Sequence, residues 1–200
     1  MIAIFQKIKN RKNGLNFRRR RRKFNRGRFR NCIIISLESA AVIFAAYLLV
    51  TAFGRVTNSY GQSMDPTIHS GDRLLLDRIS YRISSPKRGD IVSFHPAGNL
   101  NSEIMIKRIV GVPGDKLEIR SGTLYVNGSI SDAVSHVDAM DQDGLLSSPM
   151  KLRKGEYFVL GDNRNNSEDS RFETIGNITK SEIIGKIWFN ITPGNFGLMQ

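Results

Sequence analysis

The sequence has almost no cysteine and few histidines. Cys32 is the only cysteine among 200 residues, so the chain cannot form an internal disulfide. The three histidines, His69, His95 and His136, lie in turn-like or irregular sequence. No local pattern links any of them to a carboxylate. We therefore interpret them as surface residues rather than as members of a catalytic triad.

Acidic residues are missing from the N-terminal part of the chain. Residues 1–31 contain 13 Lys and Arg and no Asp or Glu, whereas the chain beyond Gly54 has 17 basic and 17 acidic residues. The tail therefore accounts for the formal net charge of +12. Its basic and aromatic residues could bind nucleic acid or anionic lipid. We favour lipid, because the tail adjoins an apolar run, and we expect no nucleic-acid partner.

The apolar run, residues 32–53, has 18 apolar residues out of 22. A helix of this length reaches about 33 Å, enough to cross the hydrocarbon core of a bilayer. Glu38 is its only charge and lies in the first third, close to the interface. Cys32 could be acylated at this edge, although we interpret it as a plain apolar residue. A buried helix of a soluble protein fits poorly with a helix that is apolar on every side.

The run is longer than the roughly 7 to 15 apolar residues of a cleaved signal, and it ends without a clear Ala-x-Ala site. We therefore expect an uncleaved anchor. Basic residues before a span face the cytoplasm, which places residues 54–200 outside. The predicted organisation is a basic cytoplasmic tail (1–31), a transmembrane anchor (32–53) and an extracytoplasmic β domain (54–200).

The pattern after the anchor is one of short strands and turns, with no internal repeat and no long helical period. Strands are expected in residues 72–81, 90–96, 156–162 and 183–191, and three more within residues 103–129. A turn is expected after each of these three: Pro113-Gly114 suits a type II turn, Ser121-Gly122 a second turn and Asn127-Gly128 a hairpin turn. Residues 130–150 carry four acids and no Lys or Arg, and we interpret them as a loop. The fold class is mainly β.

One serine, Ser63, stands in "SYGQSMDPTIHSGD", between small or polar residues and a Met-Asp-Pro sequence. Pro66 restricts the backbone here. Such a serine could be a nucleophile or part of a surface turn. A nucleophilic serine needs a base, and a lysine can serve if desolvation lowers its pKa.

Lys107 has a suitable setting for that role. In "EIMIKRIVG" it shares one face of a strand with Met105 and Ile109, while Arg108 points to the other face. A lysine with apolar neighbours on its own face is unusual for a solvated position. A lysine whose stem lies along an edge strand would give the same pattern.

A third segment, "GDNRNNSEDSR" (161–171), is rich in polar and charged residues directly after a hydrophobic strand. By composition alone it could be a surface turn or a cation site. Together with "SMDPT" (63–67), "GDIVSF" (89–94) and "IKRIVGVPGD" (106–115), and in the same order, it resembles the type I signal peptidases of bacteria. The resemblance covers the anchor and most of residues 59–190.

This resemblance implies a membrane-anchored serine endopeptidase on an all-β fold, which removes signal peptides from exported preproteins at the outer face of the cytoplasmic membrane. It implies Ser63 as nucleophile, Lys107 as general base and Ser167 as the residue that orients the lysine by a hydrogen bond. The implied supporting polar network comprises Arg108, Asp162, Asp169 and Arg171, and the implied substrate cleft comprises Met64, Met105 and Ile106. No cofactor and no metal are expected.

An oxyanion in this reaction needs hydrogen-bond donors. The Ser63 backbone N–H can be one. Some relatives supply a second from a hydroxyl two residues before the nucleophile, but this chain has Gly61 there, so the second donor stays open.

Two other functions compete with this one. Self-cleaving repressors share the Ser-Lys dyad, but the anchor and the full 161–171 segment argue against them. A non-catalytic membrane protein with a β presentation domain is disfavoured by the presence of both Ser63 and Lys107.

Overall fold

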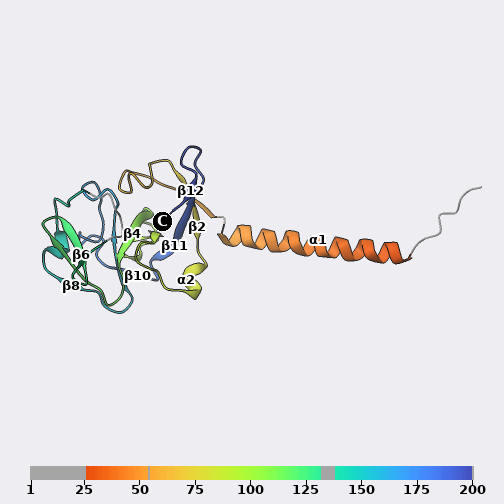
Figure 1. The fold of residues 1–200 in the computed structure, drawn as a ribbon, viewed down its shortest axis with the longest axis horizontal. Coiled ribbons are helices and arrows are strands. Elements are labelled where there is room, and N and C mark those ends of the chain that lie inside the picture. The colour runs from red at the N-terminus through yellow and green to blue at the C-terminus, as the bar shows by residue number, and fades with distance from the viewer. Residues whose placement is uncertain (1–25, 54, 132–137, 200) are drawn as a thin grey trace, which may run out of the picture. The chain divides into compact units, whose positions relative to one another are not determined.

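A computed structural model describes residues 26–53, 55–131 and 138–199. The first element is the helix α1 (Arg26–Phe53), drawn in orange in Figure 1. It contains the whole predicted span and begins six residues earlier. Its residues Arg26–Leu48 are long and apolar enough to cross a membrane, and its described side chains are exposed. Most of the predicted basic tail lies outside the described residues.

The chain from residue 55 onward forms two antiparallel sheets, so the predicted β fold class is confirmed. The larger sheet has the order β1-β2-β11-β3-β4-β9-β10, with β12 paired to β11. Its strands are β1 (Arg55–Asn58), β2 (Arg73–Asp77), β3 (Ile91–Phe94), β4 (Met105–Gly111), β9 (Glu156–Leu160), β10 (Ile178–Thr179), β11 (Ile183–Asn190) and β12 (Gly197–Leu198).

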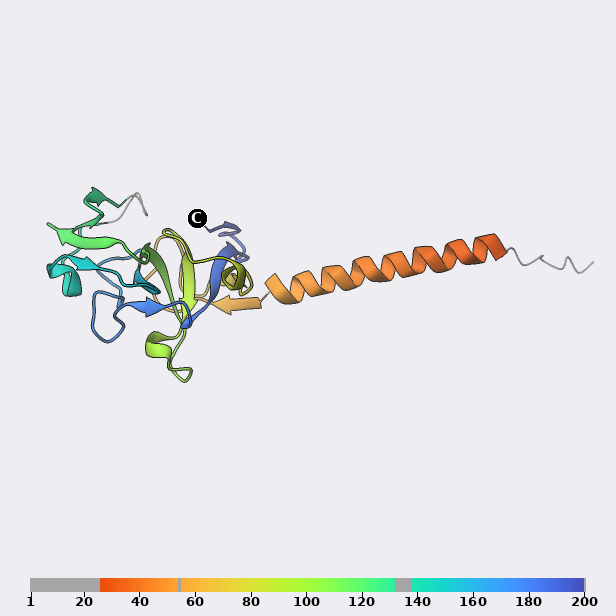
Figure 2. The ribbon, with the colours of Figure 1, turned by 90° about the horizontal axis from the view of Figure 1, so that it is seen from below.

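The smaller sheet has the order β7-β6-β5-β8. Figures 1 and 2 show it, in green and cyan, at one end of the β domain. Its strands are β5 (Lys116–Arg120), β6 (Thr123–Val126), β7 (Ser129–Ile130) and β8 (Met150–Lys151). Short helices lie between strands: α2 (Ser80–Ile83) and two 3-10 turns, η1 (Pro96–Gly98) and η2 (Gly144–Ser147).

Each run predicted as a strand contains one, but one prediction was too long. The run 72–81 ends as a strand at Asp77, and α2 begins at Ser80. The carboxylate of Asp77 accepts hydrogen bonds from the backbone N–H groups of Ile79 and Ser80, at 2.8 and 3.0 Å, and from the Ser80 hydroxyl. These bonds satisfy the first N–H groups of a helical turn and compete with the sheet.

The three predicted turns join β4 to β5, β5 to β6, and β6 to β7. Gly114 has φ +95°, and the Asp115 N–H donates to the Val112 carbonyl at 3.0 Å, as a type II turn requires. Asn127 and Gly128 both have positive φ, at +53° and +84°, which is typical of a two-residue hairpin turn.

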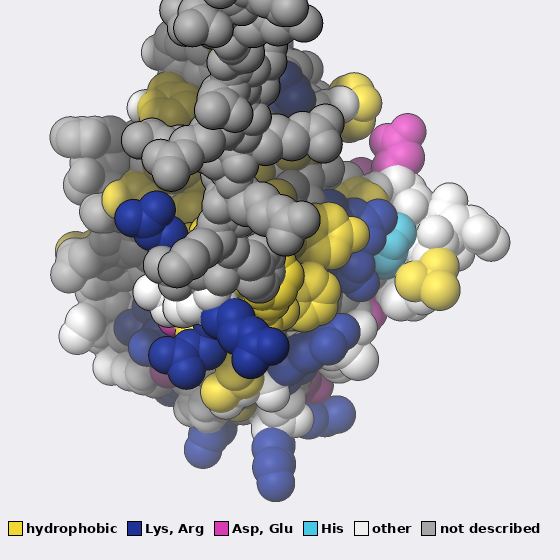
Figure 3. All heavy atoms as spheres, turned by 90° about the vertical axis from the view of Figure 1, so that its right-hand side faces the viewer, with side chains coloured by type: hydrophobic (Ala, Val, Ile, Leu, Met, Phe, Trp, Pro, Cys, Tyr) yellow, Lys and Arg dark blue, Asp and Glu magenta, His cyan; other side chains and the backbone are white. Residues whose placement is uncertain are grey.

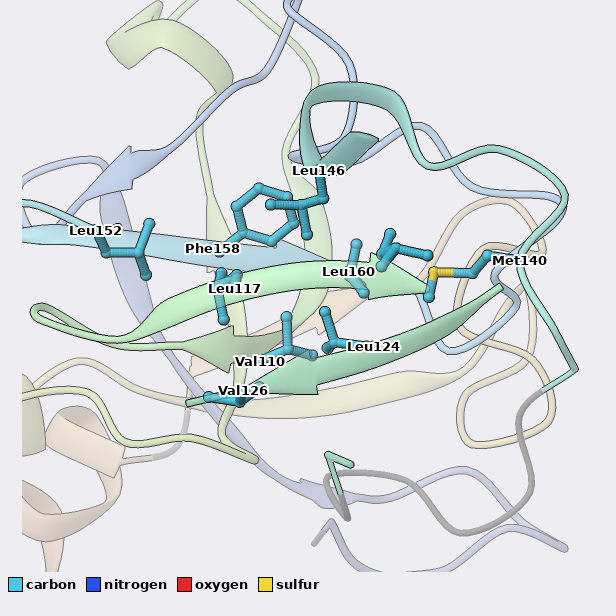
Figure 4. Packing of buried hydrophobic residues seen from close by; sticks show 10 residues of the cluster. Val110, Leu117, Leu124, Val126, Met140, Leu146, Leu152, Phe158 and Leu160 are labelled. Carbon is cyan, nitrogen blue, oxygen red and sulfur yellow. The ribbon is translucent and has the colours of Figure 1, made fainter. Parts of the chain in front are cut away.

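The main core of the β domain lies where β4 and β9 of the larger sheet meet the smaller sheet. Figure 4 shows Val110, Phe158 and Leu160 pointing toward Leu117 and Leu124. Val110 of β4 packs in this cluster, while Ile109 and Ile106 pack in two others, so β4, which carries Lys107, is held from both faces. The segment 130–150, predicted as a loop, contributes the fully buried Leu146.

Leu146 should therefore hold its segment onto the core. We expect Leu146→Ala to lower the free energy of unfolding by about 2 to 5 kcal/mol through the cavity it leaves. Leu145→Ala, at the half-buried neighbour, is the control and should have a smaller effect. Unfolding of the detergent-solubilised chain measures both. Equal losses for the two variants would show that Leu146 does not anchor this segment.

Candidate active site

Ser63 lies in the connection between β1 and β2, in a turn held by backbone hydrogen bonds. The Ser59 N–H donates to the Asp72 carbonyl at 2.8 Å, and the Ile68 N–H donates to the Met64 carbonyl at 2.9 Å. Met64 and Ile68 are buried in the core, at 2% and 0% exposure. The Ser63 side chain between these anchors remains half-buried, so it is fixed by its neighbours yet open to one side.

Lys107 is in the middle of β4, between β3 and β9, and only 3% exposed. Its Nζ donates a hydrogen bond to Ser63 Oγ at 2.6 Å. Burial lowers the pKa of Lys107 from 10.5 to about 8, although the carboxylates of Asp169 and Glu168 act in the opposite direction. A substantial fraction of the amine is therefore neutral in mildly alkaline solution, and a neutral amine can accept a proton.

The segment 161–171 fixes the backbone on the other side of Ser63. The Asn163 N–H donates to the Ser63 carbonyl at 3.1 Å, and Asn163 Nδ2 donates to the Gln62 carbonyl at 3.0 Å. A Cβ at Gly161 would lie 2.4 Å from the Ser63 carbonyl oxygen and 2.2 Å from Ser167 Oγ. Only glycine fits at this contact. Sequence reasoning assigned no role to Gly161 or Asn163.

Two buried ion pairs support this segment. Arg108 makes a bidentate pair with Asp162, with Nε–Oδ1 2.8 Å and Nη2–Oδ2 2.7 Å. Arg171 makes another with Asp169, with Nε–Oδ1 2.8 Å and Nη2–Oδ2 3.0 Å. Removing one partner of a buried pair costs about 3 to 5 kcal/mol. The four residues predicted as a supporting network are thus brought together in two pairs.

Ser167 joins the second pair. Its Oγ donates to Asp169 Oδ2 at 2.9 Å, and the same oxygen accepts the Gly161 N–H at 3.1 Å. Among the described residues, the Lys107 amine hydrogen-bonds Ser63 and not Ser167. Ser167 therefore lies in the site through its bond to Asp169, whose carboxylate also acts electrostatically on Lys107.

Arg164 is a further buried residue of the segment that the sequence did not single out. It is 8% exposed, and its Nε donates to the Gly161 carbonyl at 3.2 Å. Arg171 Nη2 donates to the Arg164 carbonyl. Burial lowers the pKa of Arg164. An arginine in a short polar segment is normally expected at the surface, so nothing in the sequence indicated that Arg164 is buried.

A cleft of about 780 Å³ opens beside the serine and the lysine. Its walls come from the β1–β2 connection and from the start of β4. The three residues predicted to shape a substrate cleft all line it: Met64, Met105 and Ile106.

Neither of the two described histidines lines the cleft or hydrogen-bonds Ser63 or Lys107. His69 Nδ1 is 2.5 Å from Asp65 Oδ1, and His95 Nδ1 is 3.3 Å from the Ser102 carbonyl. His136 lies outside the described residues. Within the described ranges, no three His, Cys, Asp or Glu side chains gather in a group that could hold a metal ion.

Comparison with known proteins places this geometry in a family. Residues 33–192 match the family described as signal peptidase, peptidase S26. A probable signal peptidase I-2 from Synechocystis is 38% identical over 135 residues, covering 66% of this chain and 60% of that protein. Signal peptidase IB from Staphylococcus aureus is 35% identical over 173 residues, covering 78% of this chain and 87% of that protein.

A crystal structure of a signal peptidase I from Enterococcus faecalis V583 is 33% identical in sequence, with a TM-score of 0.41. The match covers 52% of this chain and 97% of the Enterococcus faecalis chain.

The family match spans most of the helix, the Ser63 connection, β4 and the 161–171 segment. This confirms the hydrolase class predicted from the sequence and sets aside both competing functions. The chain belongs to the signal peptidase family, peptidase S26.

Proposed function

We propose that this chain is a type I signal peptidase that cuts exported preproteins with Ser63 as nucleophile and Lys107 as general base. The observation that carries the proposal is the 2.6 Å hydrogen bond between Lys107 Nζ and Ser63 Oγ. The amine is buried, and its pKa is lowered to about 8. The two requirements for a lysine base, contact with the nucleophile and a depressed pKa, are met in one pair.

The proton transfers follow from this contact. The neutral Lys107 amine takes the Ser63 hydroxyl proton as Oγ attacks the scissile carbonyl carbon, which gives a tetrahedral oxyanion. The ammonium then gives its proton to the leaving nitrogen as the peptide bond breaks and an ester with Ser63 remains. Lys107 next accepts a proton from water, which attacks the ester, and returns it to Ser63 as the acid leaves.

The oxyanion is assigned to the Ser63 backbone N–H as one donor. That N–H has no acceptor among the described residues, so it is free for a ligand. Gly61, with φ +81°, has no hydroxyl to add. The second donor therefore comes from a backbone N–H or from water.

Specificity is assigned to the apolar part of the cleft. Met64 and Ile106 line the cleft beside the dyad and are only 2% and 8% exposed, and we assign shallow substrate pockets to them. Shallow pockets reject large side chains sterically, which suits the small residues at positions −1 and −3 of a signal peptide.

The remaining site residues are assigned to positioning. Asp162 binds Arg108, the residue that follows Lys107 in the sequence. Asp169 binds Arg171 and Ser167. We assign Ser167 to the orientation of Lys107; its hydrogen bond to Asp169, whose carboxylate acts electrostatically on the lysine, supports this role.

The location proposed is the cytoplasmic membrane, with α1 as a single-pass anchor. The basic residues before the span place the N-terminus in the cytoplasm and the β domain outside, where translocated preproteins emerge. Anionic lipids are the proposed partner of the basic tail.

The dyad can be tested with a labelled preprotein and the detergent-solubilised full chain. Ser63→Ala and Lys107→Ala should each abolish cleavage after a small residue. Lys107→Arg should fail too, because a guanidinium stays protonated. Turnover by the unmodified chain should rise with pH through a midpoint near 8, since only the neutral amine is a base.

Lys116→Arg, at an exposed position of β5, is the matched control and should cleave normally. Substantial cleavage by Lys107→Arg would assign the base to another group.

Ser167→Ala should lose less cleavage activity than Ser63→Ala or Lys107→Ala. The hydroxyl orients but exchanges no proton with substrate, so turnover should fall roughly ten- to a hundredfold, with little change in KM. The rise of turnover with pH should persist, with its midpoint displaced. An unchanged turnover together with an unchanged pH profile would remove Ser167 from the site.

The orientation can be tested with protease added to right-side-out spheroplasts. Residues 130–150 should be cut, while the tail should stay intact until the membrane is permeabilised. Digestion of the tail with protection of the β domain would reverse the proposed topology.

A further inference from the structure

A second pocket, of about 610 Å³, opens where β1, the end of β2, α2 and β11 meet. It lies next to the cleft, since Val56, Thr57 and Ile104 line both. The proposed catalytic chemistry does not use it.

The mouth of this pocket is basic. Arg55, Arg78, Arg82 and Lys180 all line it and are all exposed. The structure gives no ion pair for any of these four side chains within the residues it describes. Lys180 Nζ donates to the Ser84 carbonyl at 2.8 Å, which leaves two of the three ammonium N–H groups.

The only carboxylate in the lining among the described residues is Glu182. Its Oε2 already accepts from the Thr179 N–H at 2.5 Å and from Thr179 Oγ1 at 2.8 Å. It thus closes its own turn between β10 and β11 rather than neutralising the arginines. Four cations therefore face one open space with a single occupied acid between them.

The interior of the pocket has one unsatisfied polar group. Ser93, on β3, is 0% exposed and lines the pocket. Its hydroxyl has no hydrogen-bond partner among the described residues. Buried hydroxyls are nearly always satisfied, so an oxygen-rich ligand in this pocket would complete the bonding of Ser93.

The walls are apolar. Leu100 is 79% exposed, Ile104 48% and Val56 40%, and all three line the pocket. Figure 3, seen from the right-hand side of Figure 1, shows Lys and Arg side chains, in dark blue, beside hydrophobic side chains, in yellow. Basic groups around an exposed apolar wall match a ligand with an anionic head and a hydrocarbon tail.

The chain connectivity brings this pocket close to such ligands. β1 begins at Arg55, two residues after Phe53, the last residue of α1. Two residues span at most about 7 Å, so Arg55 stays near the end of the apolar helix. If α1 spans the bilayer, that end lies among lipid headgroups.

We propose that this pocket binds the headgroup phosphate of an anionic phospholipid, with Arg78, Arg82 and Lys180 on the phosphate, Ser93 as an inner donor and the apolar wall against the start of an acyl chain. The proposal rests on α1 being the membrane anchor, and it does not depend on the catalytic roles of Ser63 and Lys107.

The test uses the full chain in phosphatidylcholine vesicles that contain a trace of photoreactive phosphatidylglycerol. After illumination, labelled peptides are mapped by mass spectrometry. Label is expected in the peptides of α2 and of residues 180–184, besides label in the basic tail, which serves as an internal standard. Label in the tail alone would overturn the proposal. Ser63→Ala protein should be labelled equally, so failure of the catalytic proposal is seen separately.

The variant Arg78→Ala/Arg82→Ala should reduce pocket labelling relative to tail labelling by roughly thirtyfold, because each basic residue adds a similar increment at an anionic surface. The control Lys116→Ala/Lys151→Ala removes the same charge from the smaller sheet and should change nothing. Equal reductions in both would show a general charge effect and overturn the site. Ser93→Ala, which removes only a hydroxyl, should reduce labelling by a smaller factor, and an unchanged yield would exclude Ser93 from the site.

Competition experiments distinguish the lipid from other possible ligands of this pocket. Unlabelled phosphatidylglycerol should compete, while soluble glycerol phosphate at the same concentration should not. Equal competition by the soluble phosphate would mean a free-phosphate site and contradict the lipid assignment. Displacement of the lipid by a preprotein with acidic residues, but not by a neutral one, would assign the pocket to substrate instead.

Discussion

The hydrogen bond between the buried amine of Lys107 and the hydroxyl of Ser63 is the interaction on which the rest of the site depends. An amine can take a proton from serine only while it is neutral, and burial provides that state. Lowering its pKa from 10.5 to about 8 means that burial disfavours the charged amine by about 3 kcal/mol relative to the unfolded chain. This is a cost to stability at neutral pH, because most of the amine is then charged inside the domain.

The folded chain binds fewer protons at Lys107 than the unfolded chain between pH 8 and 10.5, so the contribution of this residue to stability improves as pH rises through that window. Below pH 8 the full cost applies. The β domain offsets it with three buried hydrophobic clusters, while the pairs Arg108–Asp162 and Arg171–Asp169 hold the segment 161–171 in place. The nearby Asp169 carboxylate limits the depression, which keeps the pKa in a range where the amine can both accept and return a proton.

Much of this arrangement could be predicted from the sequence, since it is encoded locally. An apolar run of 22 residues predicts a helix, and Pro113-Gly114 and Asn127-Gly128 predict turns, because each depends on its own backbone. Lys107 could be identified as unusual because its strand neighbours are apolar. The family resemblance placed Ser63 and Lys107 in one site before any distance was known.

The features that the sequence did not reveal depend on contacts between distant segments. Gly161 is required because the Ser63 carbonyl, 98 positions away in the sequence, lies against it. Arg164 is buried with its Nη1 3.8 Å from Met140 Sδ, 24 positions away. The helix α2 is the exception, because a local contact, the Asp77 carboxylate on the Ile79 N–H, interrupts a β-rich run there. The basic pocket combines residues from β1, α2 and β11, none of which forms a motif by itself.

The most direct test of the central claim is a measurement of the pKa of Lys107 itself. The full chain, with lysine labelled with ¹³C at Cε and solubilised in detergent, can be titrated by NMR, and the Lys107 signal can be assigned by its loss in Lys107→Met. The account predicts one lysine whose Cε resonance shifts with a midpoint near pH 8, well below the others. A Lys107 midpoint near the ordinary value of about 10.4 would contradict it, because the amine would then be protonated at the pH where the proposed reaction requires a base.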